Sequence, residues 1–199
     1  MVDFTLKGQV TIVTGASKGI GRAIARAFSE AGTCVTVSSR KLEDVTRVAQ
    51  ETEMAGGQAH MGYPDQAKSL VDQTLQKGGR LDIAVNNAAT NPHFGPMLTA
   101  DAGQIEKTLD VNLKGYIRLC QQVVPHMQGQ GGGRIIGVAS VAGLRADSFM
   151  GVYSISKAGI FTLTQILARE PGEYHIRGNA IARILSGRSS AVSCGKVRL

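Results

Sequence analysis

The sequence predicts an α/β protein built on a doubly wound parallel sheet, and three observations lead to this prediction. Short, β-rich apolar runs alternate with segments of helical periodicity along most of the chain. With 199 residues, 43% of them hydrophobic, the chain has the size and apolar content of one domain with a substantial core. The 25 glycines follow no period and like charges form no long block, which excludes collagen-like and disordered proteins.

Six strands are predicted from the apolar runs. They span Gln9–Thr14, Cys34–Ser38, Gln58–Gly62, Leu81–Asn86, Arg134–Ser140 and Arg177–Ala182. Because right-handed crossovers join parallel strands, six such strands give the order 3-2-1-4-5-6. Ligands of sheets with this order bind at the carboxyl ends of the strands, so we expect the site residues there.

Five helices are predicted between the strands. They span Ile20–Ala31, Leu42–Ala55, Ala67–Lys77, Ala102–Met127 and Tyr153–Arg169. In the fourth, an apolar residue recurs every four positions, which is typical of a helix that packs on a sheet. We expect this stripe to be core rather than a binding surface; it comprises Ile105, Leu109, Leu113 and Ile117.

The net charge of +7 comes largely from the C-terminal end of the sequence. Residues 183–199 contain four basic residues and no acid, and we expect them to form an irregular basic tail after a single domain of residues 1–182. Without these four charges the balance falls from +7 to +3, which is ordinary for a globular surface. A nucleic-acid partner is therefore not expected. The four are Arg183, Arg188, Lys196 and Arg198.

Neither a membrane segment nor a metal site is predicted. Asp3 and Lys7 interrupt the N-terminal region, and no run approaches the roughly 18 apolar residues of a membrane span. The three cysteines, Cys34, Cys120 and Cys194, lie far apart with no metal-ligand spacing, which predicts reduced thiols. We expect a cytoplasmic protein.

A glycine-rich turn follows the first predicted strand and leads directly into a helix. It reads Thr14-Gly15-Ala16-Ser17-Lys18-Gly19-Ile20-Gly21, a GxxxGxG spacing. Such a turn lets the backbone approach a diphosphate, and the helix N-terminus offers free N–H groups and the positive end of its dipole. The position of the turn in the first βαβ unit favours a dinucleotide site over a purely structural turn.

The end of the second strand indicates which dinucleotide is bound. An acidic residue there would hold the ribose 2′-hydroxyl of NAD, whereas an arginine accommodates the 2′-phosphate of NADP. The sequence has Ser39, Arg40 and Lys41 at this place, and Lys18 in the glycine turn adds another cation. We therefore expect NADP(H); the alternative is that Arg40 and Lys41 are solvated charges that precede a helix.

Tyr153 and Lys157 are four residues apart, so they share one face of the last predicted helix. A protonated lysine lowers the pKa of a neighbouring phenol, which lets the phenol act as a general acid near neutral pH. On its own this spacing is weak evidence, because such pairs are usually surface contacts. Asn86-Asn87-Ala88-Ala89 after the fourth strand, Asn112, and Ser140 thirteen residues before Tyr153 make the set specific.

In this order, these motifs resemble the short-chain dehydrogenase/reductase family, and the resemblance covers residues 5 to about 182. It is strongest to NADPH-dependent carbonyl reductases on a Rossmann sheet. The resemblance implies a hydride transfer between NADP(H) and an aldehyde or ketone. The catalytic residues that it implies are Asn112, Ser140, Tyr153 and Lys157. The cofactor-binding residues that it implies are Gly15, Ser17, Lys18, Gly19, Ile20, Gly21, Ser39, Arg40, Asn87, Ala88, Tyr153 and Lys157.

The resemblance also implies a role for each catalytic residue. Tyr153 donates a proton to the substrate oxygen, and Ser140 donates a hydrogen bond to the same oxygen. Lys157 lowers the pKa of Tyr153 and binds the nicotinamide ribose, while Asn112 holds a water that connects Lys157 to solvent. The helices that carry Asn112 and Tyr153 are surfaces for homo-oligomerisation in the family.

The sequence departs from the family after the sixth strand. Where the family has an Asn-Ala-Ile-Ala-Pro-Gly stretch, this chain has Ala182-Arg183-Ile184, and no pattern for a last strand or a substrate-lid helix follows. Tyr63 stands where many members carry an aspartate near the adenine, with Asp65 as a substitute. These departures favour an alternative, a catalytically silent relative that binds dinucleotide or a protein partner. Apolar residues of two loops suggest a hydrophobic substrate; they are Phe94, Met97, Leu98, Phe149 and Met150.

Overall fold

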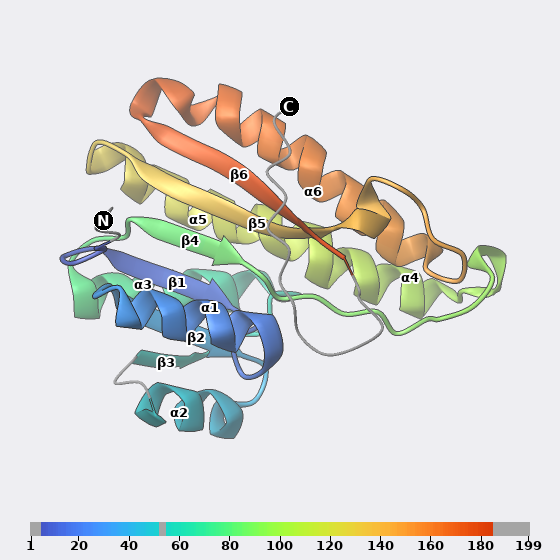
Figure 1. The fold of residues 1–199 in the computed structure, drawn as a ribbon, viewed down its shortest axis with the longest axis horizontal. Coiled ribbons are helices and arrows are strands. Elements are labelled where there is room, and N and C mark those ends of the chain that lie inside the picture. Colours follow the sequence, from blue (N-terminus) through green and yellow to red (C-terminus); the bar gives the residue numbers. More distant parts are fainter. Residues whose placement is uncertain (1–4, 52–54, 185–199) are drawn as a thin grey trace.

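The computed structural model describes residues 5–51 and 55–184, and six parallel strands form one sheet in this part of the chain. The sheet has the order β3-β2-β1-β4-β5-β6, which confirms the predicted order (Figure 1). The carboxyl ends of the strands share one edge, and the reversal of order between β1 and β4 opens a crevice there. The strands are β1 (Val10–Thr14), β2 (Cys34–Ser39), β3 (Ala55–Gln58), β4 (Ile83–Asn86), β5 (Gly133–Ser140) and β6 (Ile176–Arg183).

Helices cover both faces of the sheet, as the alternating sequence pattern predicted. Ile12 of β1 faces a core cluster with residues of α3, α5 and α6, whereas its neighbour Val13 faces a second cluster with residues of α1 and α2. This division follows from the twofold alternation of side chains along a strand. The helices are α1 (Gly19–Glu30), α2 (Leu42–Glu51), α3 (Pro64–Gly78), α4 (Ala102–Leu109), α5 (Gly115–Gly129) and α6 (Gly151–Arg169).

The third strand lies three residues earlier than the sequence pattern predicted. β3 pairs with β2 from Thr36↔Ala55 to Ser39↔Gln58, so the predicted strand at Gln58–Gly62 is wrong, and α2 ends at Glu51 rather than at Ala55. Gly56 and Gly57 give this edge strand no β-branched signature, so its position depends on pairing rather than on propensity. Residues 59–63 instead form the loop between β3 and α3.

The predicted helix at Ala102–Met127 contains a π-helical turn, η2 (Asp110–Lys114), between α4 and α5. A π turn inserts one residue into the helical ladder and rotates every later residue about the helix axis. The predicted core stripe is wrong: Ile105, Leu109 and Leu113 are half-buried and Ile117 is 36% exposed. Ile105 and Leu109 precede the π turn, so the turn accounts only for the position of Ile117, which follows it. The buried residues from 102 to 127 are Thr108, Val111, Asn112, Gly115, Tyr116, Leu119, Cys120, Val123 and Met127.

Two predictions concern residues outside the part of the chain that the structure describes. The irregular tail from Leu185 onward, including three of its four basic residues, lies outside the described residues, as does the expected lack of a last strand and lid helix. Arg183 itself is the last residue of β6. No helix in the described ranges is long and apolar enough to cross a membrane.

Candidate active site

The glycine turn between β1 and α1 has the close approaches that the sequence predicted. Gly15 has φ +65°, and a Cβ at this position would lie 2.7 Å from the Cα of Ala88. A Cβ on Gly21 would lie 2.5 Å from the carbonyl oxygen of Gly15. Because both neighbours are backbone atoms, only glycine fits at either position without a shift of the chain. The helix α1 begins at Gly19, so its free N–H groups face this turn.

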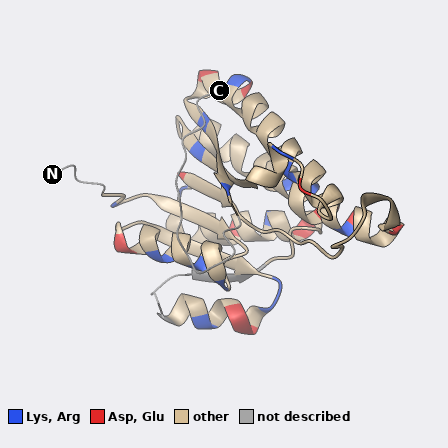
Figure 2. Cartoon of the chain, turned by 45° about the vertical axis from the view of Figure 1, so that its right-hand side comes forward, with Lys and Arg blue, Asp and Glu red and all other residues tan. Residues whose placement is uncertain are grey.

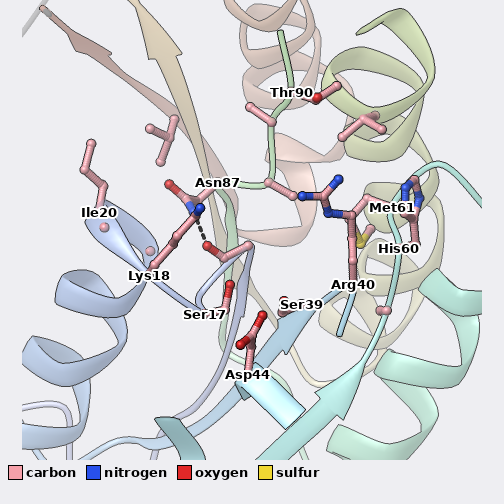
Figure 3. A pocket seen from close by; sticks show the side chains of 18 of the residues that line it. Ser17, Lys18, Ile20, Ser39, Arg40, Asp44, His60, Met61, Asn87 and Thr90 are labelled. Carbon is pink, nitrogen blue, oxygen red and sulfur yellow. Dashed lines mark hydrogen bonds between the residues drawn. The ribbon is translucent and has the colours of Figure 1, made fainter. Parts of the chain in front are cut away.

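The segment after β4 is bound tightly to the glycine turn. The hydroxyl of Thr14 accepts hydrogen bonds from the backbone N–H groups of Asn87 (3.0 Å) and Ala88 (3.1 Å). In return, the side-chain amide of Asn87 donates to the carbonyl oxygens of Thr14 (2.9 Å) and Gly15 (3.0 Å), and it is directed at the turn in Figure 3. These hydrogen bonds fix the glycine turn against the segment after β4.

A pocket of about 750 Å³ lies at the carboxyl edge of the sheet, next to this turn. Its lining includes every residue that the resemblance implied for cofactor binding: Gly15, Ser17, Lys18, Gly19, Ile20, Gly21, Ser39, Arg40, Asn87, Ala88, Tyr153 and Lys157. The structure therefore brings this set together, and the binding role of each residue stays a prediction. A pocket of this size is large enough for a cofactor.

The pocket is strongly basic. Asp44 is the one carboxylate among its lining residues, and Arg47 lies 3.6 Å from it. Figure 2 shows a continuous basic segment where β2 leads into α2, at Arg40 and Lys41. An excess of positive charge in a concave site attracts an anionic ligand. The seven cationic lining residues are Lys18, Arg40, Lys41, Arg47, Lys107, Lys157 and Arg183.

One end of the pocket lies between β2 and the loop after β3. His60 and Met61 of this loop line the pocket, and the sequence did not predict them as site residues. Figure 3 shows the Arg40 side chain extending into the pocket on the same side as these two residues. Burial, together with Arg40 and Lys107, lowers the pKa of His60. Tyr63 is 59% exposed, and neither it nor Asp65 lines the pocket. The strand β3 ends earlier than predicted, and His60 in the loop that follows it lines the pocket.

Tyr153 and Lys157 form the other end of the pocket, on α6. Lys157 is only 2% exposed, and its ammonium donates a hydrogen bond to the carbonyl oxygen of Val138 at 2.7 Å. The same nitrogen lies 5.6 Å from the centre of the Tyr153 ring. Burial, and then the positive charge of Arg183, lower the pKa of Lys157 to about 8. The predicted helical pair is thus a buried ammonium held beside a half-buried phenol.

Ser140 occupies the end of β5 but does not line the pocket. Its hydroxyl donates to the carbonyl oxygen of Arg183 at 3.3 Å and accepts from the backbone N–H of Ala142 at 3.2 Å. Both contacts are those of a residue that caps a turn. A rotation of the hydroxyl away from Arg183 would free its proton for a substrate oxygen, so its catalytic role stays a prediction.

Asn112 lies in the π turn and is buried. Its side-chain amide donates to the carbonyl oxygen of Thr90 (2.9 Å) and to the hydroxyl of Ser156 (3.0 Å). Its oxygen accepts from the N–H of Thr90 at 2.7 Å. Asn112 therefore ties a pocket-lining segment to the helix of Tyr153 and Lys157. The water that the resemblance placed here stays a prediction.

Comparison with known proteins decides the family. The family model described as short chain dehydrogenase matches residues 9–185. The chain belongs to the short-chain dehydrogenase family. This family consists of oxidoreductases that use a nicotinamide dinucleotide, so the protein has a dehydrogenase/reductase role. The chain spans about 70% of the length of the relatives named below.

Two curated relatives are similar over most of the chain. Dehydrogenase/reductase SDR family member 4 of Oryctolagus cuniculus is 37% identical over 182 residues, which are 89% of this chain and 70% of the relative. Tropinone reductase-like 3 of Erythroxylum coca is 34% identical over 187 residues, with 92% and 71% coverage.

Solved structures of short-chain dehydrogenases have the same fold. A putative short-chain alcohol dehydrogenase from Sinorhizobium meliloti 1021 superposes with a TM-score of 0.85 at 30% identity, over 92% of this chain and 74% of that one. A xylitol dehydrogenase with bound NAD⁺ superposes with a TM-score of 0.86 at 28% identity, over 92% and 72%. The similarity extends across the whole described sheet.

Proposed function

We propose that this short-chain dehydrogenase transfers a hydride between NADP(H) and a carbonyl or alcohol substrate, reducing aldehydes or ketones. The observation that supports this most strongly is the buried ammonium of Lys157 beside Tyr153 at one end of a basic pocket whose other end carries Arg40. A lysine held in a buried site by one carbonyl oxygen has a cost in stability, and a catalytic use explains it.

The residues present fit a dinucleotide phosphate. Gly15 and Gly21 let the turn pack closely against Ala88 and against itself, and Gly19, where a Cβ would meet nothing within 4 Å, leaves its backbone open to a diphosphate. At the end of β2, Ser39 is followed by Arg40 and Lys41 with no carboxylate at that point. This arrangement supports NADP(H) over NAD(H), because guanidinium groups bind phosphates through paired hydrogen bonds. When bound, NADP(H) supplies the hydride.

The chain's own residues carry the proton and the positioning. The phenol of Tyr153 donates its proton to the substrate oxygen during reduction and takes it back during oxidation. The ammonium of Lys157 stabilises the phenolate that forms, since an adjacent positive charge favours the negative form. The hydrogen bonds of Asn112 hold the segment at Thr90 at a fixed distance from the start of α6, so that the two walls of the pocket keep their spacing.

A second candidate function is dinucleotide binding without turnover. It is favoured by the Ser140 hydroxyl, whose proton points at the Arg183 carbonyl oxygen rather than into the pocket. Oxidation of NADPH measured with a panel of aldehydes and ketones separates the two candidates. Turnover that falls by at least about a hundredfold in Tyr153→Phe supports the reductase. Calorimetric binding of NADPH with no turnover of any carbonyl supports the silent alternative, and turnover unchanged in Tyr153→Phe refutes the mechanism.

We also propose that a second copy of the chain covers the helices α4, α5 and α6. Ile155 (55% exposed) and Ile166 (41% exposed) lie eleven residues apart and so share one face of α6. The half-buried Leu113 packs against Gly159 on the same face, and Ile117 continues it. Sedimentation analysis of the wild type and of Ile166→Glu tests this: we expect a dimer that the charge dissociates. The cytoplasmic location stays a prediction from the sequence.

Two loops with exposed aromatic residues flank the catalytic end. One follows Thr90 and the other precedes Tyr153, and the N–H of Gly95 joins them by a hydrogen bond to the carbonyl oxygen of Phe149 at 3.0 Å. The rings of Phe94 and Phe149 lie 6.0 Å apart and are 74% and 51% exposed. These rings support an apolar or aromatic group on the substrate.

A further inference from the structure

Arg183 stands at the catalytic end of the pocket, at a place where the family carries a proline. The register between β5 and β6 pairs it with Ser140, and the Ser140 hydroxyl donates to its carbonyl oxygen. Arg183 also lines the same pocket as Tyr153 and Lys157. The last residue of β6 therefore brings a guanidinium to the groups that act on the substrate.

The charges at this end of the pocket are not balanced by the lining residues. Lys157 is buried, and its printed hydrogen bond goes to a neutral carbonyl oxygen. Arg183 is near enough to lower the pKa of Lys157, as like charges do. The carboxylate of Asp44 lies by Arg47 at the far end. Two cationic residues that line one pocket repel each other, and an anion bound near both stabilises them.

The diphosphate of the cofactor is a poor match for this anion. The glycine turn follows β1, and β6 lies three strands away in the order β1-β4-β5-β6. With about 4.8 Å between neighbouring strands, the backbone of Arg183 lies roughly 14 Å from that of the turn. The turn also has its own cation, Lys18, and the N-terminus of α1. Arg183 is placed instead beside β5, whose residues Val138 and Ala139 line the catalytic end.

We propose that Arg183 binds a carboxylate on the substrate, next to the carbonyl group that is reduced, so that the preferred substrates are oxo acids. The proposal rests on the reductase function proposed above. The carbonyl carbon receives a hydride from the reduced nicotinamide, and the carbonyl oxygen receives the proton of Tyr153. The products are a hydroxy acid and the oxidised cofactor, and the carboxylate itself is unchanged. A guanidinium suits this task because it meets both carboxylate oxygens with parallel N–H groups.

Benzoylformate and its methyl ester test the proposal, because they share the same ketone and phenyl ring and differ in one negative charge. We expect the wild type to prefer the acid in kcat/KM. Arg183→Gln lowers kcat/KM for the acid by about a hundredfold and for the ester by less than about threefold, and Arg183→Lys falls between them. Arg177→Gln is the matched control: Arg177 is an exposed arginine of the same strand that does not line the pocket. It keeps the preference of the wild type.

Equilibrium binding of benzoylformate to the protein saturated with NADP⁺ gives a readout that is independent of turnover. Weaker binding in Arg183→Gln, with an unchanged dissociation constant for NADPH, supports the proposal. If Arg183→Gln has the same acid-to-ester ratio of kcat/KM and the same affinity for benzoylformate as the wild type, the proposal is overturned. An equal loss for both substrates together with weaker NADPH binding also overturns it, because Arg183 then serves the diphosphate. Absence of turnover for both compounds and for every compound of the carbonyl panel refutes the proposed reductase function alone, and the binding experiment then decides the role of Arg183.

Discussion

Asn112 and Thr90 form a reciprocal pair of hydrogen bonds, with the N–H of Thr90 donating to Oδ1 at 2.7 Å and Nδ2 donating to the Thr90 carbonyl oxygen at 2.9 Å. The same Nδ2 reaches the hydroxyl of Ser156 on α6 at 3.0 Å. One side chain that is 2% exposed therefore replaces a backbone partner for the segment after β4 and joins it to the catalytic helix.

Replacing Asn112 with alanine is expected to lower the free energy of unfolding by about 3 kcal/mol, because three buried hydrogen bonds are lost at about 1 kcal/mol each. Ser156→Ala removes one of the three together with the hydrogen bond from the Ser156 hydroxyl to the carbonyl oxygen of Tyr153, and is expected to lower it by about 2 kcal/mol. Urea denaturation of both variants and the wild type measures the difference. Equal effects of the two substitutions would show that the Thr90 pair contributes nothing.

Replacing Gly21 with alanine is expected to destabilise the protein even though Gly21 lies within α1. Alanine normally stabilises a helix relative to glycine, but the new Cβ would lie 2.5 Å from the Gly15 carbonyl oxygen. We expect a loss of about 2 kcal/mol and weaker NADPH binding, because the turn must shift. Gly129→Ala, at the open end of α5, is the matched control and is expected to raise stability by up to about 1 kcal/mol. Thermal unfolding measures both.

The buried Lys157 makes stability depend on pH in a defined window. Its pKa is about 8 in the folded protein against 10.5 for an ordinary lysine. Between these values the unfolded chain holds the proton and the folded chain has released it, so the free energy of unfolding rises with pH across this window. Below pH 8 the full cost of burying the charge is present.

Lys157→Met lacks this titration, so its stability relative to the wild type is expected to be greatest below pH 8. The difference is expected to shrink by about 3 kcal/mol as the pH rises to 10.5, which is the pKa shift converted to free energy. Denaturant unfolding of both proteins at several pH values from 7 to 10.5 measures it. A stability difference that stays constant over this range would show that burial does not lower the pKa of Lys157.

Replacing Arg40 with alanine is expected to raise the dissociation constant of NADPH by about ten- to a hundredfold and to leave that of NADH within about threefold, because only NADPH carries the 2′-phosphate. Arg26→Ala removes an exposed arginine of α1 that pairs with Glu30 and does not line the pocket. It serves as the control and keeps both constants. Fluorescence titration of each variant with the two cofactors measures these constants. An equal loss of affinity for NADPH and NADH would show that Arg40 does not contact the 2′-phosphate.

The patterns that predicted correctly are those in which neighbouring residues alone decide the structure. The positive φ of Gly15 and the close approach of Gly21 to the Gly15 carbonyl oxygen require glycine within one short turn, and these are local requirements. The sequence pattern did not predict β3 correctly, because its glycines have low strand propensity and the strand forms through pairing with β2. It failed again at Ile117, because the π turn at Asp110–Lys114 changes the phase of the helix, and no propensity marks such a turn.

Periodicity and turn chemistry in the sequence determined the order of the sheet, the dinucleotide turn and the helical pair of Tyr153 and Lys157. The tertiary structure decided which groups surround that pair. The contact between Ser140 and Arg183, and the place of His60 in the pocket, depend on strand register and on where β3 ends. Strand pairing joins residues that are distant in the chain, and a shift of a few residues changes which side chain enters the site, so composition and spacing cannot specify it.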